Sequence, residues 1–131
     1  MRRRTLRSAK RSGRRRRASP KPEAERYHHS VYVVLLRDDI LKHRWVVRKN
    51  PSRDPLKPAI YVGMTGLPVD HRFQNHLNGY KSATVVHKYG VRLLPELFEH
   101  LNPMPFDAAA QMERDLAEDL RAEGYAVLGG T

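Results

Sequence analysis

The apolar residues of this chain fall into short blocks separated by polar or proline-rich stretches. Residues 30–36 are β-branched and aromatic, which is typical of a buried strand, and residues 59–63 repeat that character. Between them lies a polar, basic stretch, 37–58. Within it, residues 38–49 predict a short helix, because an Asn-Pro pair follows and would stop a helix there.

Beyond the second block the spacing of apolar residues becomes helical. Val69, Phe73 and Leu77 recur every four residues and therefore share one face of a predicted helix. Residues 82–89 predict another short helix. Residues 91–98 predict a strand, which an internal proline weakens.

The C-terminal part of the chain predicts one long helix and one short strand. The helix begins at Phe106 and ends at Gly124, since glycine favours the position after a helix, and the strand covers 126–128. The resulting fold class is α/β (α+β). We expect a small, central, mostly antiparallel three-stranded sheet flanked by helices.

Charge divides the 131 residues into two regions. Of the formal net charge of +11, residues 1–26 carry +10 and the body, 27–131, carries +1. The first region has almost no large apolar side chain to offset the entropy of ordering, so we expect a disordered basic arm. Its densest basic run, which predicts attraction to nucleic-acid phosphates, is Arg14, Arg15, Arg16 and Arg17. A solubilising tail, or upstream translated sequence without a role, is the alternative interpretation.

Composition excludes several classes of protein. The chain has no cysteine, which excludes disulfides, Cys-ligated zinc and a thiol nucleophile. It has no apolar run of about 20 residues and no signal-peptide pattern. We therefore expect a cytoplasmic protein, nucleoid-associated if bacterial, that is not secreted and has no membrane partner.

One acidic residue occupies a position where the pattern requires an apolar one. At about 100° per residue, Glu113 falls among Ala109, Leu116 and Leu120, in the middle of the apolar stripe of the last helix. A carboxylate there is costly unless it is paired, hydrogen-bonded or bound to a metal. Two interpretations follow: a metal-binding carboxylate, or a structural Glu that pairs with an Arg or reaches solvent.

The first long helix has a similar polar pair beside its apolar stripe. Arg72 and His76 are four residues apart and share a face, so together they could hold a phosphate. An Arg packing its stem at the helix border beside a structural His is the alternative. Trp45, Tyr80 and Tyr89 could stack on bases, although core packing is the favoured interpretation for each.

Together these residues resemble the motifs of the GIY-YIG nuclease superfamily over residues 30–130. The matching elements, in chain order, are Ser30-Val31-Tyr32, Tyr61-Val62-Gly63 with Met64-Thr65-Gly66, Arg72-Phe73-Gln74-Asn75-His76, and Glu113. The sequence departs from the motifs of the superfamily at three points. Ser30 replaces a glycine, 37–58 is a long insert, and no Asn follows Asn102, whereas many members carry one after the Glu.

The resemblance implies a metal-dependent endonuclease that hydrolyses phosphodiester bonds, of DNA rather than RNA. Mg²⁺ (or Mn²⁺) would bind Glu113, and Arg72 would clamp the phosphate. Tyr32 would take the proton of the attacking water, with positive charge supplied by His76, Arg72 or the metal. The remaining implied contacts are Tyr61, which would position the water or phosphate, and Gly63 and Thr65, which would lie against the nucleic acid.

Two other functions stay open at this stage. The missing Asn favours a catalytically impaired nucleic-acid-binding module that keeps the fold and uses the basic arm for affinity. A structural or partner-binding domain is the third class. Because the sequence has no separate recognition domain, targeting would require the insert 37–58, a homodimer or a partner protein.

Overall fold

A computed structural model describes residues 27–130. The basic arm, with its expected disorder and the phosphate contacts of Arg14, Arg15, Arg16 and Arg17, lies outside the described residues, as does Thr131. The elements are β1 (Ser30–Leu36), the 3-10 helix η1 (Asp38–Lys42), α2 (Arg44–Lys49), β2 (Ala59–Thr65), α3 (Val69–Leu77), α4 (Thr84–Tyr89), β3 (Gly90–Leu93), the 3-10 turns η2 (Pro95–Leu97) and η3 (Glu99–Leu101), α5 (Phe106–Ala122) and β4 (Ala126–Gly129).

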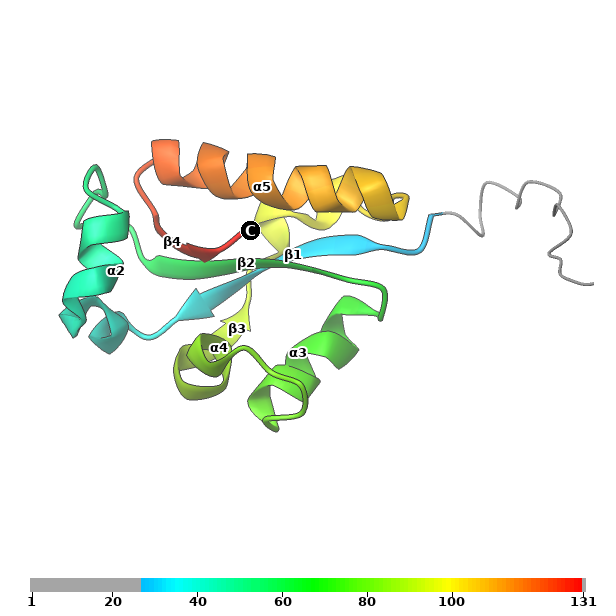
Figure 1. Cartoon of the computed structure of the whole chain (residues 1–131), viewed down its shortest axis with the longest axis horizontal. Helices are drawn as coiled ribbons and strands as arrows, with labels where there is room; N and C mark the ends of the chain where they lie inside the picture. Colours follow the sequence, from blue (N-terminus) through cyan, green and yellow to red (C-terminus); the bar gives the residue numbers. More distant parts are fainter. Residues whose placement is uncertain (1–26, 131) are drawn as a thin grey trace, which may run out of the picture.

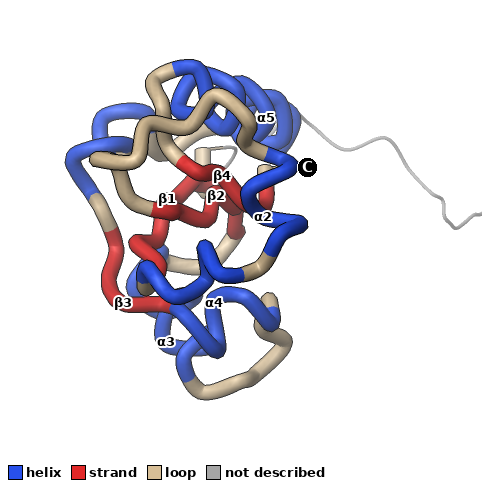
Figure 2. The backbone as a smooth tube through the Cα atoms, turned by 90° about the vertical axis from the view of Figure 1, so that its left-hand side faces the viewer, coloured by secondary structure: helices blue, strands red, loops and turns tan. Residues whose placement is uncertain are grey.

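The strands form one mixed sheet in the order β3-β1-β2-β4. β1 is antiparallel to both β2 and β3, whereas β4 is parallel to β2. Helix α5 covers one face of the sheet, and α3 and α4 lie on the other (Figures 1 and 2). The expected α+β class with a mostly antiparallel sheet is confirmed, and the short strand expected near 126–128 adds a fourth, parallel member.

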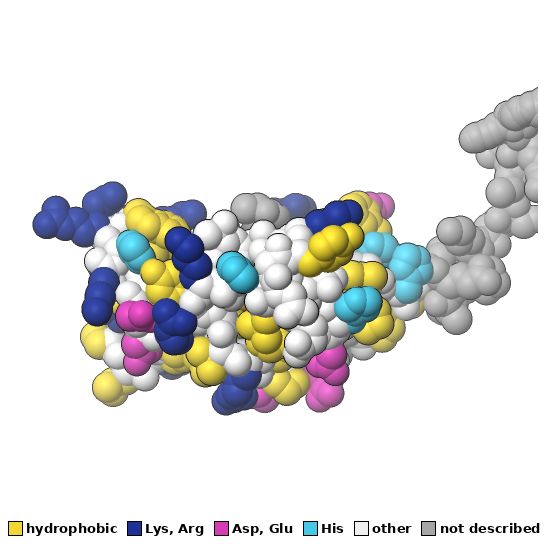
Figure 3. Space-filling model, turned by 90° about the horizontal axis from the view of Figure 1, so that it is seen from below, with side chains coloured by type: hydrophobic (Ala, Val, Ile, Leu, Met, Phe, Trp, Pro, Cys, Tyr) yellow, Lys and Arg dark blue, Asp and Glu magenta, His cyan; other side chains and the backbone are white. Residues whose placement is uncertain are grey.

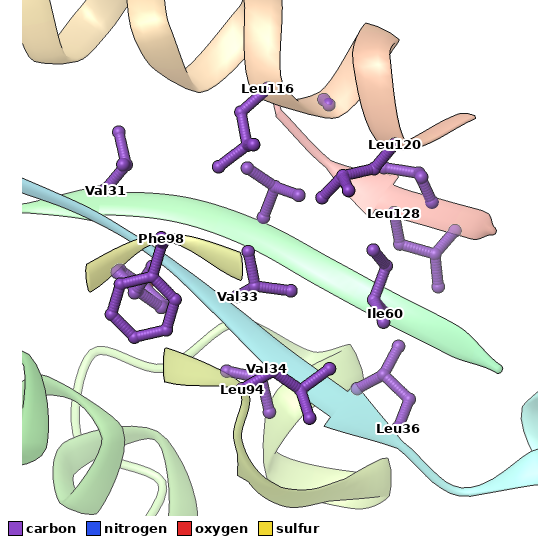
Figure 4. Packing of buried hydrophobic residues seen from close by; sticks show 14 of the residues in the cluster. Val31, Val33, Val34, Leu36, Ile60, Leu94, Phe98, Leu116, Leu120 and Leu128 are labelled. Atoms are coloured by element: carbon purple, nitrogen blue, oxygen red, sulfur yellow. The ribbon is translucent and has the colours of Figure 1, made fainter. Parts of the chain in front are cut away.

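The core lies between the sheet and α5, with a second layer under α3 and α4. Leu116 and Leu120 project from α5 toward the strands (Figure 4). Because β1 is buried on both faces, its sequence is a nearly continuous apolar run rather than an alternating one. No helix within 27–130 combines the length and the apolar composition needed to cross a membrane.

Two predicted elements differ from the structure. The strand expected over 91–98 ends at Leu93, because Pro95 has no N–H to continue the ladder, and the chain turns into η2 and η3. The side chain of Asn102 then pairs with the edge of β1 that β3 does not reach. Its Oδ1 accepts the N–H of Val31 at 2.9 Å, and its Nδ2 donates to the Val31 carbonyl at 2.7 Å. The helix expected over 38–49 is divided into η1 and α2.

The insert 37–58 is attached to the body through Asn50, which is 1% exposed. Its Oδ1 accepts the N–H of Val127 at 2.9 Å and Nε–H of Arg121 at 3.0 Å. Its Nδ2 donates to the carbonyls of Val46 and Val127, at 2.9 and 3.2 Å. Residues from α2, α5 and β4 therefore meet at one amide, and the insert is an integral part of the fold.

Two of the three aromatic residues expected in the core lie at the surface. Trp45 is 43% exposed because α2 turns its neighbour Val46 into the core, and Tyr80 is 59% exposed. Tyr89 is half-buried at the end of α4. The expectation of core packing is therefore wrong for Trp45 and Tyr80.

Candidate active site

Two tyrosines predicted to act together lie on the face of the sheet that carries α3. Tyr32 pairs with Gly63 across β1 and β2, and Tyr61 pairs with Val34, so the tyrosines are diagonal neighbours with ring centroids 6.4 Å apart. A Cβ at Gly63 would lie 2.6 Å from both Cζ and Oη of Tyr32. The glycine of the Tyr-Val-Gly element is therefore required for the Tyr32 ring to lie across β2.

His76 of α3 lies beside both tyrosines, with its ring centroid 5.9 Å from each of theirs, and is fully buried. The backbone N–H of Ala83 donates to His76 Nδ1 at 3.1 Å. In the neutral imidazole the hydrogen is then on Nε2, which lies 2.7 Å from Tyr32 Oη. His76 therefore donates to the phenol oxygen, and the phenolic hydrogen of Tyr32 is free to be donated elsewhere.

The charge state of His76 corrects one expectation. Burial, aided by the positive charge of Arg72, lowers the pKa of His76 to about 4. The imidazole is neutral at pH 7 and does not supply the positive charge that the sequence suggested. Its contribution is a directed N–H, which leaves Arg72 as the cation among these residues.

Both phenols are neutral at pH 7 in the protein alone. Burial is the largest cause that raises the pKa of Tyr32. The neighbouring Tyr61 and the charge of Glu113 raise this pKa further. The positive charge of Arg72 opposes this rise. Burial and Glu113 likewise raise the pKa of Tyr61 against the charge of Arg72. These couplings place Arg72 and Glu113 within electrostatic reach of both rings.

Glu113 lies half-buried on α5, and burial raises the pKa of its carboxyl while the adjacent Arg114 lowers it. Within residues 27–130 the carboxylate has no salt bridge; the ion pair present there joins Arg37 and Asp39. The alternative of a structural ion pair with an Arg is thus not seen in this part of the chain. Its partial exposure also fits the other form of that alternative, in which the side chain reaches solvent.

Gly63 and Thr65 shape the site from β2. Thr65 is buried, and its Oγ1 accepts the N–H of Leu67 at 3.0 Å, which closes the turn between β2 and α3. Gly63 faces the Tyr32 ring. Contact of either residue with nucleic acid stays a prediction.

Two contributors were missed by the sequence analysis. Ala83 acts through its backbone N–H, for which the sequence carries no signal. Gly129 has φ +75°, and a Cβ there would lie 2.8 Å from a Tyr61 ring carbon and 2.4 Å from the Val62 carbonyl oxygen. The Gly-Gly pair at 129–130 was the available sign that a ring or backbone comes close there.

The donor set limits which metal could bind. No three His, Asp or Glu side chains come together among the described residues, so a protein-only cage of the kind zinc requires is not formed there. Mg²⁺ commonly binds through one or two carboxylates and keeps several waters. A half-buried carboxylate without an ionic partner fits that habit, and Glu113 is the residue that would hold the ion.

Comparison with known proteins does not extend these observations. No family model, no curated protein and no solved structure matches the chain. The resemblance of the short motifs to the GIY-YIG superfamily therefore stays a prediction, and the function has to be inferred from the residues and their geometry.

Proposed function

We propose that this protein is a metal-dependent endonuclease that hydrolyses phosphodiester bonds, with DNA as the preferred substrate. One observation carries the proposal: a half-buried carboxylate without an ionic partner within 27–130 and an arginine each lie in electrostatic reach of two phenols, one of which a neutral imidazole orients. The residues concerned are Glu113, Arg72, Tyr32, Tyr61 and His76. Three of these types, carboxylate, guanidinium and phenol, cover the needs of phosphodiester hydrolysis: a metal ligand, a phosphate clamp and a proton acceptor.

Arg72 binds the phosphate. A guanidinium presents two parallel N–H groups to phosphoryl oxygens and keeps its charge at any working pH. Since His76 is neutral, the phosphate's negative charge is balanced on the protein side by Arg72. Tyr61, beside it, donates a hydrogen bond that positions the attacking water or the phosphate.

As a phenolate, formed when its own proton passes to solvent, Tyr32 accepts the proton of the attacking water. The hydrogen bond from His76 Nε2–H to Tyr32 Oη favours the phenolate, because an N–H donor stabilises the charged oxygen more than the neutral one. Burial works in the opposite direction. When bound at Glu113, Mg²⁺ or Mn²⁺ supplies positive charge that lowers the phenol's pKa and polarises the phosphate.

A cleavage assay on the full chain tests the proposal. Branched, nicked, single-stranded and duplex DNA are incubated with and without Mg²⁺, using wild type, Glu113→Gln and Glu118→Gln. Glu118 is exposed on the same helix and provides the matched control. We expect Mg²⁺-dependent cleavage that falls by about 10³-fold or more in Glu113→Gln and is kept in Glu118→Gln. Full cleavage by Glu113→Gln would refute the proposal.

A second function is favoured by the raised pKa of Tyr32 and by the absence of an Asn after Asn102. In this case the protein keeps the fold, binds nucleic acid with the basic arm supplying affinity, and performs no hydrolysis. Isothermal titration with Mg²⁺ separates the two functions. A nuclease binds the ion in a way that Glu113→Gln abolishes, whereas a binding module shows no heat that depends on Glu113.

A further inference from the structure

A second surface of the molecule combines aromatic rings with positive charge. A groove of about 200 Å³ lies between the insert and α4, and its walls include His43, Trp45, Val85, Lys88 and Tyr89. His43 Nε2 and Tyr89 Oη are hydrogen-bonded at 2.9 Å, which fixes the two rings in a near-perpendicular arrangement. The Trp45 ring lies next to that of His43, with centroids 6.4 Å apart and a tilt of 37°. The proposed catalytic site contributes none of these residues.

The charge around this groove is positive. Neither α2 nor α4 contains an acidic residue, and their exposed cations are Arg44, Arg48, Lys49 and Lys88. η1 contributes two acids, of which Asp39 is paired with Arg37 and Asp38 is exposed, so the cations remain in excess. In Figure 3, Lys and Arg side chains are the most numerous charged groups at the left end of the molecule, where Figure 1 places α2, with hydrophobic, His and some acidic side chains among them. The surroundings therefore complement a polyanion that also carries flat, apolar groups.

The groove begins next to the proposed catalytic site. Thr84 lines it and follows Ala83, whose N–H fixes the tautomer of His76. His87, also on α4, has Nδ1 3.2 Å from the carbonyl oxygen of His76. The six residues of α4 span about 9 Å, which is the length of about two to three stacked nucleotides. A strand bound at the site could therefore continue along α4 into the groove.

We propose that the groove between the insert and α4 binds an unpaired segment of nucleic acid, with a base stacked on Trp45 and its phosphate near Lys88. A base inside a duplex hides its faces, so stacking on an exposed indole selects single strands. Sequence preference is weak, because every base offers a π-face. The inference that this segment belongs to the substrate rests on the proposed nuclease function. The inference that the groove binds an unpaired strand does not depend on that function.

Trp45 is the only tryptophan of the chain, so its fluorescence reports directly on the groove. The full chain is titrated in EDTA with an oligothymidylate of about eight nucleotides, and separately with a duplex of the same length. Raised salt suppresses phosphate-only attraction by basic segments. We expect quenching by the single strand at concentrations about tenfold below those needed for the duplex. Absent quenching, or equal quenching by both, overturns the proposal.

Variants of Trp45 test whether its indole contributes to the affinity for the single strand. With a labelled oligothymidylate and anisotropy as the readout, Trp45→Ala weakens binding about tenfold while Trp45→Phe keeps it within about threefold. Leu56→Ala, which removes another exposed apolar side chain, serves as the control and leaves affinity unchanged. Unchanged affinity in Trp45→Ala overturns the proposal, even if the single strand binds well.

Two variants that change the net charge equally separate binding in the groove from general electrostatic attraction. Lys88→Glu weakens binding several-fold more than Lys57→Glu, although both change net charge equally. Lys57 lies over the ring of Tyr125 and lines no part of the groove. Equal effects show that only overall charge matters and overturn the proposal. So does quenching of Trp45 by a poly-glutamate peptide as effectively as by the oligonucleotide, which would mark a site for acidic peptides.

The binding and cleavage assays can refute the groove proposal and the nuclease proposal independently of each other. If the groove proposal is wrong, Trp45 is not quenched while Mg²⁺-dependent cleavage, and its loss in Glu113→Gln, persist. If the nuclease proposal is wrong, no substrate is cut while quenching and its dependence on Lys88 remain.

Discussion

Two buried polar clusters of this protein differ in how completely they are hydrogen-bonded. At Asn50, both donors and both acceptor positions of the amide are used, by groups from α2, α5 and β4. At the proposed catalytic site, the bond from His76 to Tyr32 leaves the phenolic hydrogen unassigned, and Glu113 has no ionic partner within 27–130. The first cluster is complete without a ligand, whereas the second retains capacity for one.

The comparison distinguishes polar groups that stabilise the fold from polar groups that are available to bind a ligand or take part in catalysis. A fully satisfied buried amide strengthens the fold and fixes how its elements meet. A half-buried carboxylate without a partner destabilises the fold and is expected where a ligand compensates. Substitutions in the two clusters should therefore have opposite effects on stability and on activity.

The largest expected effect is on catalysis. Glu113→Gln should lower the cleavage rate about 10³-fold or more, which is a loss of about 4 kcal/mol in transition-state stabilisation. The melting temperature should stay the same or rise, because a neutral amide is easier to bury than a carboxylate. Thermal unfolding alongside the cleavage assay measures both quantities. A melting temperature that falls sharply would mean that Glu113 is structural, contradicting the comparison.

The next effect is on stability and comes from the other cluster. Asn50→Ala removes four hydrogen bonds and leaves the buried N–H of Val127 without its acceptor, so we expect a loss of about 3 kcal/mol in the free energy of unfolding. Activity per folded molecule should persist. Urea unfolding monitored by circular dichroism measures the loss, with the exposed Asn78→Ala as the control.

A pH titration tests the neutral state of His76. The pKa of this group is lower in the folded protein than in the unfolded chain, so its contribution to stability is present above pH 6.5 and is lost as the pH falls toward 4. Between pH 7 and pH 5 the loss is about 2 kcal/mol. The difference in unfolding free energy between wild type and His76→Gln should shrink by that amount. A constant difference would show that His76 is not held neutral.

The smallest expected effect is at Tyr61. Its hydroxyl makes no hydrogen bond recorded within the described part of the chain, so Tyr61→Phe should change the free energy of unfolding by less than about 0.5 kcal/mol. Cleavage should fall about tenfold, since one positioning hydrogen bond is lost. Paired unfolding and cleavage measurements check this. A large loss of stability would place Tyr61 with Asn50 rather than with Glu113.

The sequence predicted the parts of the fold that depend on neighbouring residues. Continuous apolar blocks identified β1 and β2, and a regular helical stripe identified α3 and α5. Glu113 stood out because one acid interrupts a long, regular stripe. The exposure of Trp45 could not be predicted, because α2 has only six residues, and fewer than two helical turns do not define a face.

Contacts between distant positions could not be predicted in this way. Asn50 bonds to Val127 across 77 positions, and nothing near either residue indicates the other. The tautomer of His76 depends on the backbone of Ala83, whose side chain is irrelevant to the bond. The parallel direction of β4 depends on the crossover through α5 and not on the four residues of the strand.

The amide of Asn102 has a consequence for self-association. Where β3 ends, β1 would present an open edge, a template on which a second molecule could add a strand. By bonding both the N–H and the carbonyl of Val31, Asn102 occupies that template with a side chain. Together with the backbone bonds of Met104 to His29 and of Leu94 to Val33, this side chain covers the edge of β1 against strand addition where β3 has ended.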